Sequence, residues 1–134
     1  KHPLFEDFPT DDHSNWQWWS IVRNARPLVL NATRHEYKPL IQVVDNVERN
    51  HKLGLLFEFA VDKGRVLVCM SDLDAVASTV EGRQFRRAIV QYMTSDKFAP
   101  TERLTAGELE RLLTADVTER QIVGVANLSN YDVQ

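Results

Sequence analysis

The stretch LGLLFEFAVDKGRVLVCMS, residues 53–71, decides the class of the fold. Two apolar runs, 53–61 and 65–71, flank a three-residue connection that ends in Gly64, and glycine there can adopt a positive φ. This pattern predicts a tight β-hairpin with a bulge. Both strands are apolar on both faces, which is typical of central strands in a sheet that is covered on both sides. We therefore expect a layered α/β domain rather than a small open β-sandwich.

Shorter segments surround this hairpin. The other segments with strand-like patterns are 27–33, 39–44 and 122–126. The segments predicted to be helical are 15–24, 81–95 and 105–113. Asp12 or Ser14 is expected to cap the first helix, and a capping box of Thr105 and Glu108 is expected to open the last.

The spacing of apolar residues assigns faces to the predicted elements. In the strand at 53–61, the residues expected to share one face are Leu55, Phe57, Phe59 and Val61. In the helix at 81–95, the residues expected to face the core are Phe85, Ala88, Ile89, Tyr92 and Met93. The residues expected on its opposite side are Arg83, Arg86, Arg87 and Gln91. The helix is therefore predicted to be amphipathic.

Composition excludes several classes of protein. The chain has 134 residues, 43% of them apolar and 26% charged, which fits one globular domain. Its net charge of −3 argues against a general nucleic-acid binder, which needs a basic face, and the apolar runs are too short to span a bilayer. The single Cys69 excludes an intramolecular disulfide and a cysteine-based zinc site, and the four histidines are scattered. We expect neither a metal nor another cofactor.

The chain is expected to divide near residue 100. Residues 1–100 are predicted to form the α/β domain. Residues 101–134 are predicted to add a C-terminal helix and a short strand that pack on this domain or link it onward. The first residues contain no signal-like apolar stretch, so the compartment cannot be read from them.

Three tryptophans close to His13 form the most unusual cluster in the sequence. Trp16 and Trp19 are three residues apart and so share one side of the predicted helix, where they would anchor it to the sheet, leaving Trp18 more exposed. Aromatic faces also stack on sugar rings, so Trp18, Trp16 and His13 are candidate carbohydrate-binding residues. Both interpretations stay open from the sequence.

Other polar residues with possible chemistry have simpler structural interpretations. Cys69 lacks the glycines of a strand-end nucleophile elbow, and free cysteine is commonly buried. Asp45, Asp72 and Asp74 stand where turn formers and helix caps are common. The basic segment 49–52 is expected to be a solvated turn. No residue is therefore assigned a catalytic role.

Several segments, in this order and spacing, resemble the C-terminal region of large bacterial glycoside hydrolases of the family 2 type, which include β-galactosidases and β-glucuronidases. These segments are HPLF (2–5), FPT (8–10), HSNWQWW (13–19), KPLIQVVDN (38–46), NHKLGLLFE (50–58), KGRVLVC (63–69), RQF (83–85) and YMTS (92–95). The order of elements is also similar to the second half of class I glutamine-amidotransferase-like domains and to the trimerisation domain of some β-galactosidases. This resemblance implies a flavodoxin-like layered sandwich, present as a partial version with a mixed sheet and a β-hairpin.

The resemblance implies a function without catalysis. The catalytic glutamates of the family lie in a separate barrel domain, and the amidotransferase cysteine elbow has no counterpart here. The implied function is a non-catalytic accessory domain that contacts the catalytic domain of its parent enzyme or a second copy of itself, in a periplasmic or cell-envelope location. The alternatives are a carbohydrate-binding module for an oligosaccharide and, less well supported, a small stand-alone hydrolase.

Overall fold

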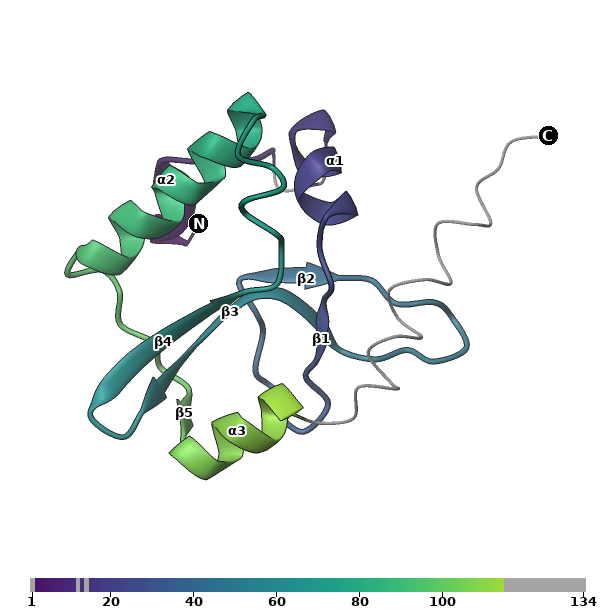
Figure 1. Cartoon of the computed structure of the whole chain (residues 1–134). Coiled ribbons are helices and arrows are strands. Elements are labelled where there is room, and N and C mark those ends of the chain that lie inside the picture. Colours follow the sequence, from purple (N-terminus) through teal and green to yellow (C-terminus); the bar gives the residue numbers. More distant parts are fainter. Residues whose placement is uncertain (1, 12, 14, 115–134) are drawn as a thin grey trace.

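The computed structural model describes residues 2–11, 13 and 15–114, which form three α-helices, one 3₁₀ helix and five strands. In chain order these elements are η1 (Pro3–Glu6), α1 (Trp16–Arg23), β1 (Leu28–Val29), β2 (Ile41–Val43), β3 (Leu53–Val61), β4 (Gly64–Cys69), α2 (Val80–Thr94), β5 (Arg103–Leu104) and α3 (Ala106–Thr114) (Figure 1). The strand predicted at 122–126 lies outside the described residues. The predicted mixed α/β class is confirmed.

Strand β3 is the centre of the sheet, and the four other strands pair with it. Because Leu56 pairs with Cys69 of β4 and with Ile41 of β2, these two strands lie on opposite edges of β3. By the same reasoning β1 lies on the β4 edge and β5 on the β2 edge. Strands β1, β2 and β4 run antiparallel to β3 and β5 runs parallel, so the sheet is mixed and mostly antiparallel.

The predicted β3–β4 hairpin is present, but its glycine does not have the expected role. Val61 pairs with Gly64, so the connection contains only Asp62 and Lys63. The positive φ of 49° falls on Asp62, whereas no glycine of the described residues has a positive φ. Aspartate tolerates this conformation better than most residues because its short side chain can hydrogen-bond locally. Gly64 instead begins β4.

A bulge in β3 changes which side chains face which way. Ile41 pairs with Leu56, yet its neighbour Gln42 pairs with Gly54, so Leu55 is an extra residue on β3. At the bulge, two consecutive side chains point to the same face of the sheet, so Leu55 and Leu56 both pack against α1 and α2. The prediction that Leu55 shares a face with Phe57 is therefore wrong.

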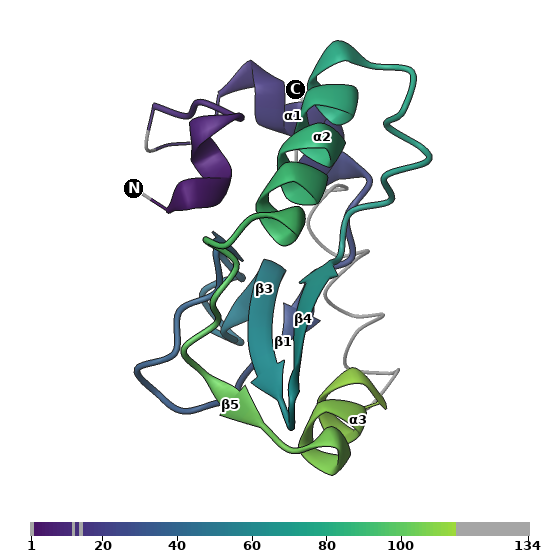
Figure 2. The ribbon, with the colours of Figure 1, turned by 90° about the vertical axis from the view of Figure 1, so that its left-hand side faces the viewer.

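Two hydrophobic cores lie on the two faces of the sheet. Figure 2 shows η1, α1 and α2 on one side and α3 on the other. The first core joins Leu55 and Leu56 to Ile21 of α1 and Phe85 of α2. The second joins strand residues to Leu112 of α3; its buried members are Leu28, Leu30, Phe57, Phe59 and Leu112. The expectation of a sheet covered on both sides is confirmed.

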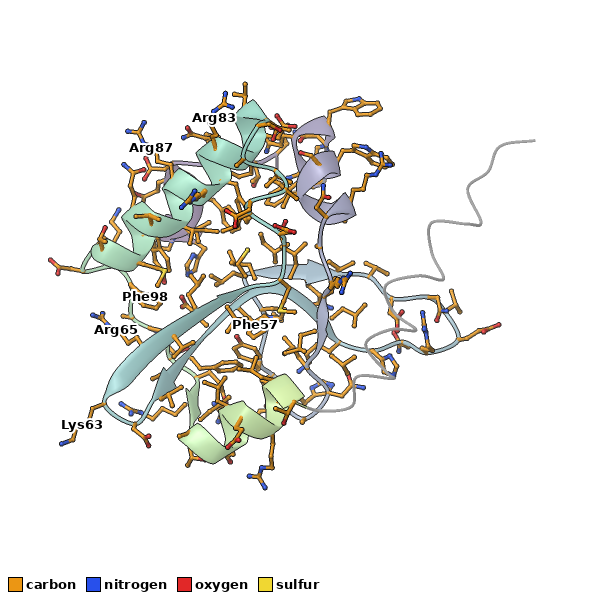
Figure 3. All side chains as sticks on the ribbon, viewed as in Figure 1. Phe57, Lys63, Arg65, Arg83, Arg87 and Phe98 are labelled. Carbon is orange, nitrogen blue, oxygen red and sulfur yellow. The ribbon has the colours of Figure 1, made fainter. Side chains whose placement is uncertain are left out.

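Helix α2 is amphipathic as predicted, with one exception. Its buried residues Phe85, Ala88, Ile89 and Tyr92 recur at helical spacing, and Thr79 caps its N-terminus by accepting from the Gly82 N–H. Arg83 and Arg87 point away from the sheet, as Figure 3 shows. Met93, expected in the core, is exposed because it lies about 100° around the helix from Tyr92, beyond the edge of the buried stripe.

The predicted helix caps have different outcomes. The N-cap of α1 is Asn15, whose side chain accepts from the Gln17 N–H, so the expected cap at Asp12 or Ser14 is wrong. The capping box of α3 is confirmed, because Glu108 accepts from the Thr105 N–H at 2.7 Å and the Thr105 hydroxyl accepts from the Glu108 N–H at 3.2 Å. Strand β5 pairs with β3, and α3 covers the second core. A division of the chain near residue 100 stays a prediction.

Candidate functional site

The tryptophans of α1 are oriented opposite to the expectation. Trp18 is only 7% exposed, whereas Trp16 is 87% and Trp19 57% exposed. The inward stripe of this short helix is formed by Trp18 and Ile21, and the Trp18 ring makes edge-on contacts with Phe8 and Phe85. The prediction of buried Trp16 and Trp19 with an exposed Trp18 is therefore wrong. Trp18 and Ile21 are also three residues apart, so this spacing alone does not indicate which side of α1 is buried.

The outer face of α1 is an exposed apolar surface. The rings of Trp16 and Trp19 lie 6.5 Å apart between centroids and are tilted by 59°. Val22, one turn further along, is also exposed. Together with Asn15 and one side of Trp18, these residues line a hollow of about 560 Å³. We call Trp16, Trp19 and Val22 the tryptophan surface.

A groove of about 610 Å³ continues from this surface toward the edge of the sheet. Trp18 and Val22 line both hollows, and the groove extends past His13 to Val44. His13 is exposed, and its ring lies 2.8 Å from the backbone carbonyl of Asp11. The structure thus gathers Trp16, Trp18 and His13 around α1, although Trp18 presents little surface. Their role in carbohydrate binding stays a prediction.

The other residues considered from the sequence make structural contacts. Burial raises the pKa of Cys69, which disfavours the nucleophilic thiolate. Asp72 caps the turn that follows β4 by accepting from the N–H groups of Asp74 and Ala75. Lys52, in the basic segment, donates to the Thr33 hydroxyl and to the backbone carbonyl of Arg34.

Asp45 organises the loop between β2 and β3. Its buried carboxylate accepts from the N–H groups of Asn46 and His51, and it forms an ion pair with Arg49 at 3.3 Å. Burial alone would raise the pKa of Asp45, but the hydrogen bonds and neighbouring positive charges outweigh it and lower this pKa. The expected turn-forming role fits these contacts.

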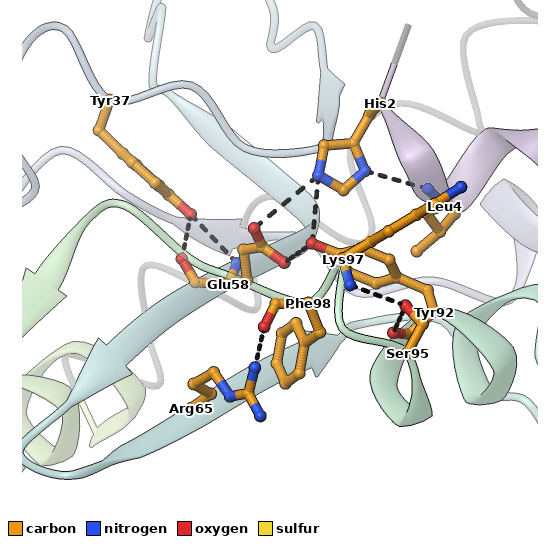
Figure 4. A network of polar contacts seen from close by, with 9 residues as sticks. All are labelled: His2, Leu4, Tyr37, Glu58, Arg65, Tyr92, Ser95, Lys97 and Phe98. Carbon is orange, nitrogen blue, oxygen red and sulfur yellow. Dashed lines mark hydrogen bonds and ion pairs between the residues drawn. The ribbon is translucent and has the colours of Figure 1, made fainter.

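A polar pocket that the sequence analysis missed surrounds Glu58. Figure 4 shows Tyr92 and His2 meeting at its carboxylate. The Tyr92 hydroxyl donates to Oε2 at 2.9 Å, and His2 Nε2 lies 3.3 Å from that hydroxyl and 3.8 Å from Oε1. The Leu4 N–H donates to His2 Nδ1, which places the proton of a neutral imidazole on Nε2. Its sequence signal is that Glu58 is the only charged residue in a nine-residue apolar strand.

Tyr37 completes the sheet beside this pocket. Between β2 and β5 one edge of β3 has no partner strand, and the Tyr37 hydroxyl fills that gap. It donates to the backbone carbonyl of Glu58 at 3.0 Å and accepts from the Glu58 N–H at 3.2 Å. Its ring stacks on Phe59 with centroids 4.9 Å apart. Burial raises the pKa of Tyr37 and of Tyr92, so both hydroxyls stay protonated at neutral pH.

Within the part of the chain that the structure describes, no group of three or more His, Cys, Asp and Glu side chains could hold a metal ion. Over the same residues, every helix is too short or too polar to cross a membrane.

Comparison with known proteins places the chain in a family. The family described as "Domain of unknown function (DUF8487)" matches residues 1–114. The chain belongs to this family. The match runs from the first residues through the end of α3, so the family unit contains the tryptophan surface, the Glu58 pocket and both cores. A search of the curated proteins found no match.

Proposed function

We propose that this chain is a non-catalytic accessory domain of a carbohydrate-degrading glycoside hydrolase of the β-galactosidase or β-glucuronidase type. The resemblance over residues 2–100 supports this kind of parent protein. A partial flavodoxin-like, glutamine-amidotransferase-like fold belongs to the same proposal. The helices on both faces of the sheet support that fold, whereas the antiparallel pairing of three strands with β3 departs from it.

The observation that carries the proposal is the tryptophan surface, which we infer to pack against the catalytic part of the parent enzyme. Large exposed aromatic residues that lie side by side are typical of interaction sites. Burying an indole removes roughly 200 Å² from water, which corresponds to about 5 kcal/mol at ~25 cal/mol/Å², before the costs of association. Trp16 and Trp19 together can therefore contribute a large part of the driving force for such a contact, Trp19 less than Trp16 because it is already partly buried.

Hydroxyl-radical footprinting with mass spectrometry tests this contact. The isolated chain is compared with the full polypeptide that its gene encodes. Trp16 and Trp19 are expected to be labelled strongly in the isolated chain and to be protected in the full polypeptide. Trp18, buried by the fold itself, is the internal control and should be labelled weakly in both. Equal labelling of Trp16 and Trp19 in the two samples would refute the docking surface.

Enzyme assays test the absence of catalysis. The isolated chain is expected not to hydrolyse aryl β-galactosides or β-glucuronides, because the resemblance places the catalytic glutamates of the family in a separate barrel domain. Glu36, Glu58 and Glu102, which line one pocket, are the carboxylates to replace first if turnover is found. Turnover that is lost when one Asp or Glu of this chain is replaced would contradict the proposal.

A carbohydrate-binding module is the second candidate, and the exposed tryptophan pair is the observation that favours it. The platform would then be Trp16 and Trp19, with His13 at the neighbouring groove. A glycan array with the wild type, Trp16→Ala and Trp19→Ala tests this function. A signal that both variants lose supports the module, and a blank array on the folded wild type excludes it for the glycans present.

A further inference from the structure

We propose that the Glu58 pocket binds the primary ammonium group of a small molecule. The inference stands on the residues of the pocket alone and not on the accessory role or on the tryptophan surface. The pocket has a volume of about 530 Å³, and its walls come from residues 2 and 3, the segment 34–40, the C-terminal end of α2 and the segment that leads to β5. This volume lies within the range of ordinary small-molecule sites.

The first argument is charge balance around the pocket. Arg34 forms a two-point ion pair with Glu102, at 2.8 and 2.6 Å. Lys97 forms an ion pair with Glu6. Two further charged residues of the rim, Glu36 and Lys38, are exposed and of opposite sign. Arg34 and Lys97 are therefore each paired with a carboxylate other than Glu58, and the partner of Lys97, Glu6, does not line the pocket.

Glu58 is the acid on the floor of the pocket that none of these cations pairs with. Its side chain is 11% exposed, and no lysine or arginine among the described residues forms an ion pair with it. Burial lowers the pKa of His2, so this neighbour is neutral at pH 7 and does not offset the carboxylate. Burial also raises the pKa of Glu58, as expected for a carboxylate without a cation. A buried charge without an opposite charge is costly, and a cationic ligand would remove that cost.

The second argument is the hydrogen-bonding capacity that the pocket leaves unused. Oε1 of Glu58 accepts no hydrogen bond from the described residues, since its nearest partner, His2 Nε2, is 3.8 Å away. The Tyr37 hydroxyl already accepts from the Glu58 N–H, and the Tyr92 hydroxyl already accepts from His2 Nε2–H. The acceptor that these side chains leave without a hydrogen bond is therefore Oε1 of the Glu58 carboxylate. An ammonium group carries three donors, no acceptor and a positive charge, which suits an anionic acceptor in kind and in sign.

A binding experiment on the whole chain tests the proposal. n-Butylammonium chloride is titrated into the ¹⁵N-labelled protein at pH 7 and constant ionic strength, and backbone amide shifts are followed by NMR. Saturable, millimolar binding is expected, with shifts at Glu58, Tyr92 and Tyr37. Glu58→Gln keeps the size of the side chain and an acceptor for Tyr92, and it should weaken binding at least tenfold. Glu110→Gln, which removes an exposed carboxylate of α3 that does not line the pocket, is the matched control and should bind like the wild type.

Other outcomes would overturn the proposal. They are the absence of saturable shifts in the folded wild type, equal binding by Glu58→Gln, and shifts confined to the tryptophan surface. Binding of 1-butanol or methyl glucoside as strong as that of butylammonium would show a site for neutral ligands instead. Folding of each variant is checked by its dispersed amide spectrum before titration. Because the tryptophan surface is not involved, failure here leaves the accessory-domain proposal untouched, and the converse also holds.

Discussion

At the scale of single residues, the polar network around Glu58 shows how one charged side chain changes the properties of an apolar strand. Its neighbours on the same face, Leu56 and Ala60, are buried apolar residues. The carboxylate is held by the Tyr92 hydroxyl, and Tyr37 binds the backbone of the same residue. Glu58 therefore links the packing of α2 on the sheet to a titratable group.

Replacement of Glu58 by glutamine is expected to change how stability depends on pH. Burial raises the pKa of Glu58 above 4.5, so the folded state binds more protons than the unfolded state between 4.5 and the raised value. The free energy of unfolding of the wild type therefore falls as pH rises through this window, and Glu58→Gln lacks this loss. Urea unfolding on both sides of pH 4.5 should show the variant gaining stability relative to the wild type as pH rises.

His2 contributes a trend of the opposite sign that is common to both proteins. Its pKa is lowered from 6.5, so its contribution to stability rises with pH up to that value. The comparison is therefore made on the difference between the two proteins. A difference that stays constant with pH would mean that Glu58 titrates alike in the folded and unfolded states.

Trp18 and Trp16 should differ sharply when each is truncated. Trp18→Ala is expected to cost about 3–5 kcal/mol, because it leaves a cavity among Phe8, Ile21 and Phe85. Trp16→Ala should change stability by less than about 0.5 kcal/mol, because its ring is exposed. Chemical denaturation followed by far-UV circular dichroism measures both. Similar costs for the two variants would contradict the orientation of α1.

At the scale of elements, the sequence predicted correctly those features that depend only on residues close together in the chain. The capping box of Thr105 and Glu108 and the apolar stripe of α2 follow from spacing alone. The orientation of α1 does not, since apolar residues occupy both of its sides and the aromatic partners Phe8 and Phe85 decide which side is buried. The bulge at Leu55 likewise depends on the pairing of β2 with β3, which no pattern within β3 indicates.

The two helical glycines of the described residues should respond to alanine in opposite directions. A Cβ at Gly82 would lie 2.1 Å from the carbonyl oxygen of Val76, a backbone atom of the turn against which α2 packs. Gly82→Ala should therefore destabilise by ~1–3 kcal/mol, despite the better helix propensity of alanine. A Cβ at Gly107 meets nothing within 4 Å, so Gly107→Ala should stabilise by about 0.5–1 kcal/mol.

Thermal unfolding of the two alanine variants against the wild type measures these effects. Gly107→Ala is the matched control, because it makes the same chemical change in an open part of a helix. Stabilisation by Gly82→Ala would show that the turn before α2 can move away from the helix.

At the scale of the whole molecule, the layered α/β class could be predicted because strands that are apolar on both faces need a cover on each side. The Glu58 pocket could not be predicted, since its walls come from η1, α2, residue 37 and the segment before β5, which are distant in sequence. The one signal in the sequence is that Glu58 is a charged residue within an apolar strand, and a single acid in a strand does not indicate which groups surround it. The pocket exists only once the sheet brings those segments together.

The tryptophan surface has a consequence for the isolated chain as a whole. Without its proposed partner, this surface is expected to pair with a second copy, and a stable homodimer would bury on the order of 1,000 Å². Trp16 and Trp19 are the largest exposed apolar side chains of this surface, so Trp16→Ser/Trp19→Ser should weaken association without unfolding the chain. Val47→Ser, at an apolar residue that is 98% exposed on the loop after β2 and does not belong to the tryptophan surface, is the control and should associate like the wild type.

Sedimentation velocity over a range of micromolar concentrations measures this association. The wild type and Val47→Ser should shift from monomer toward dimer as concentration rises, whereas the double variant should stay monomeric. Association is expected to strengthen with added sulfate salt, because salting out favours burial of apolar surface, while contacts dominated by ion pairs would weaken. A wild type that stays monomeric throughout, or a double variant that dimerises equally, would mean that α1 does not carry the contact. Dimerisation that weakens with salt would indicate a contact made by charged residues instead, such as Arg83 and Arg87 on the outer side of α2 (Figure 3).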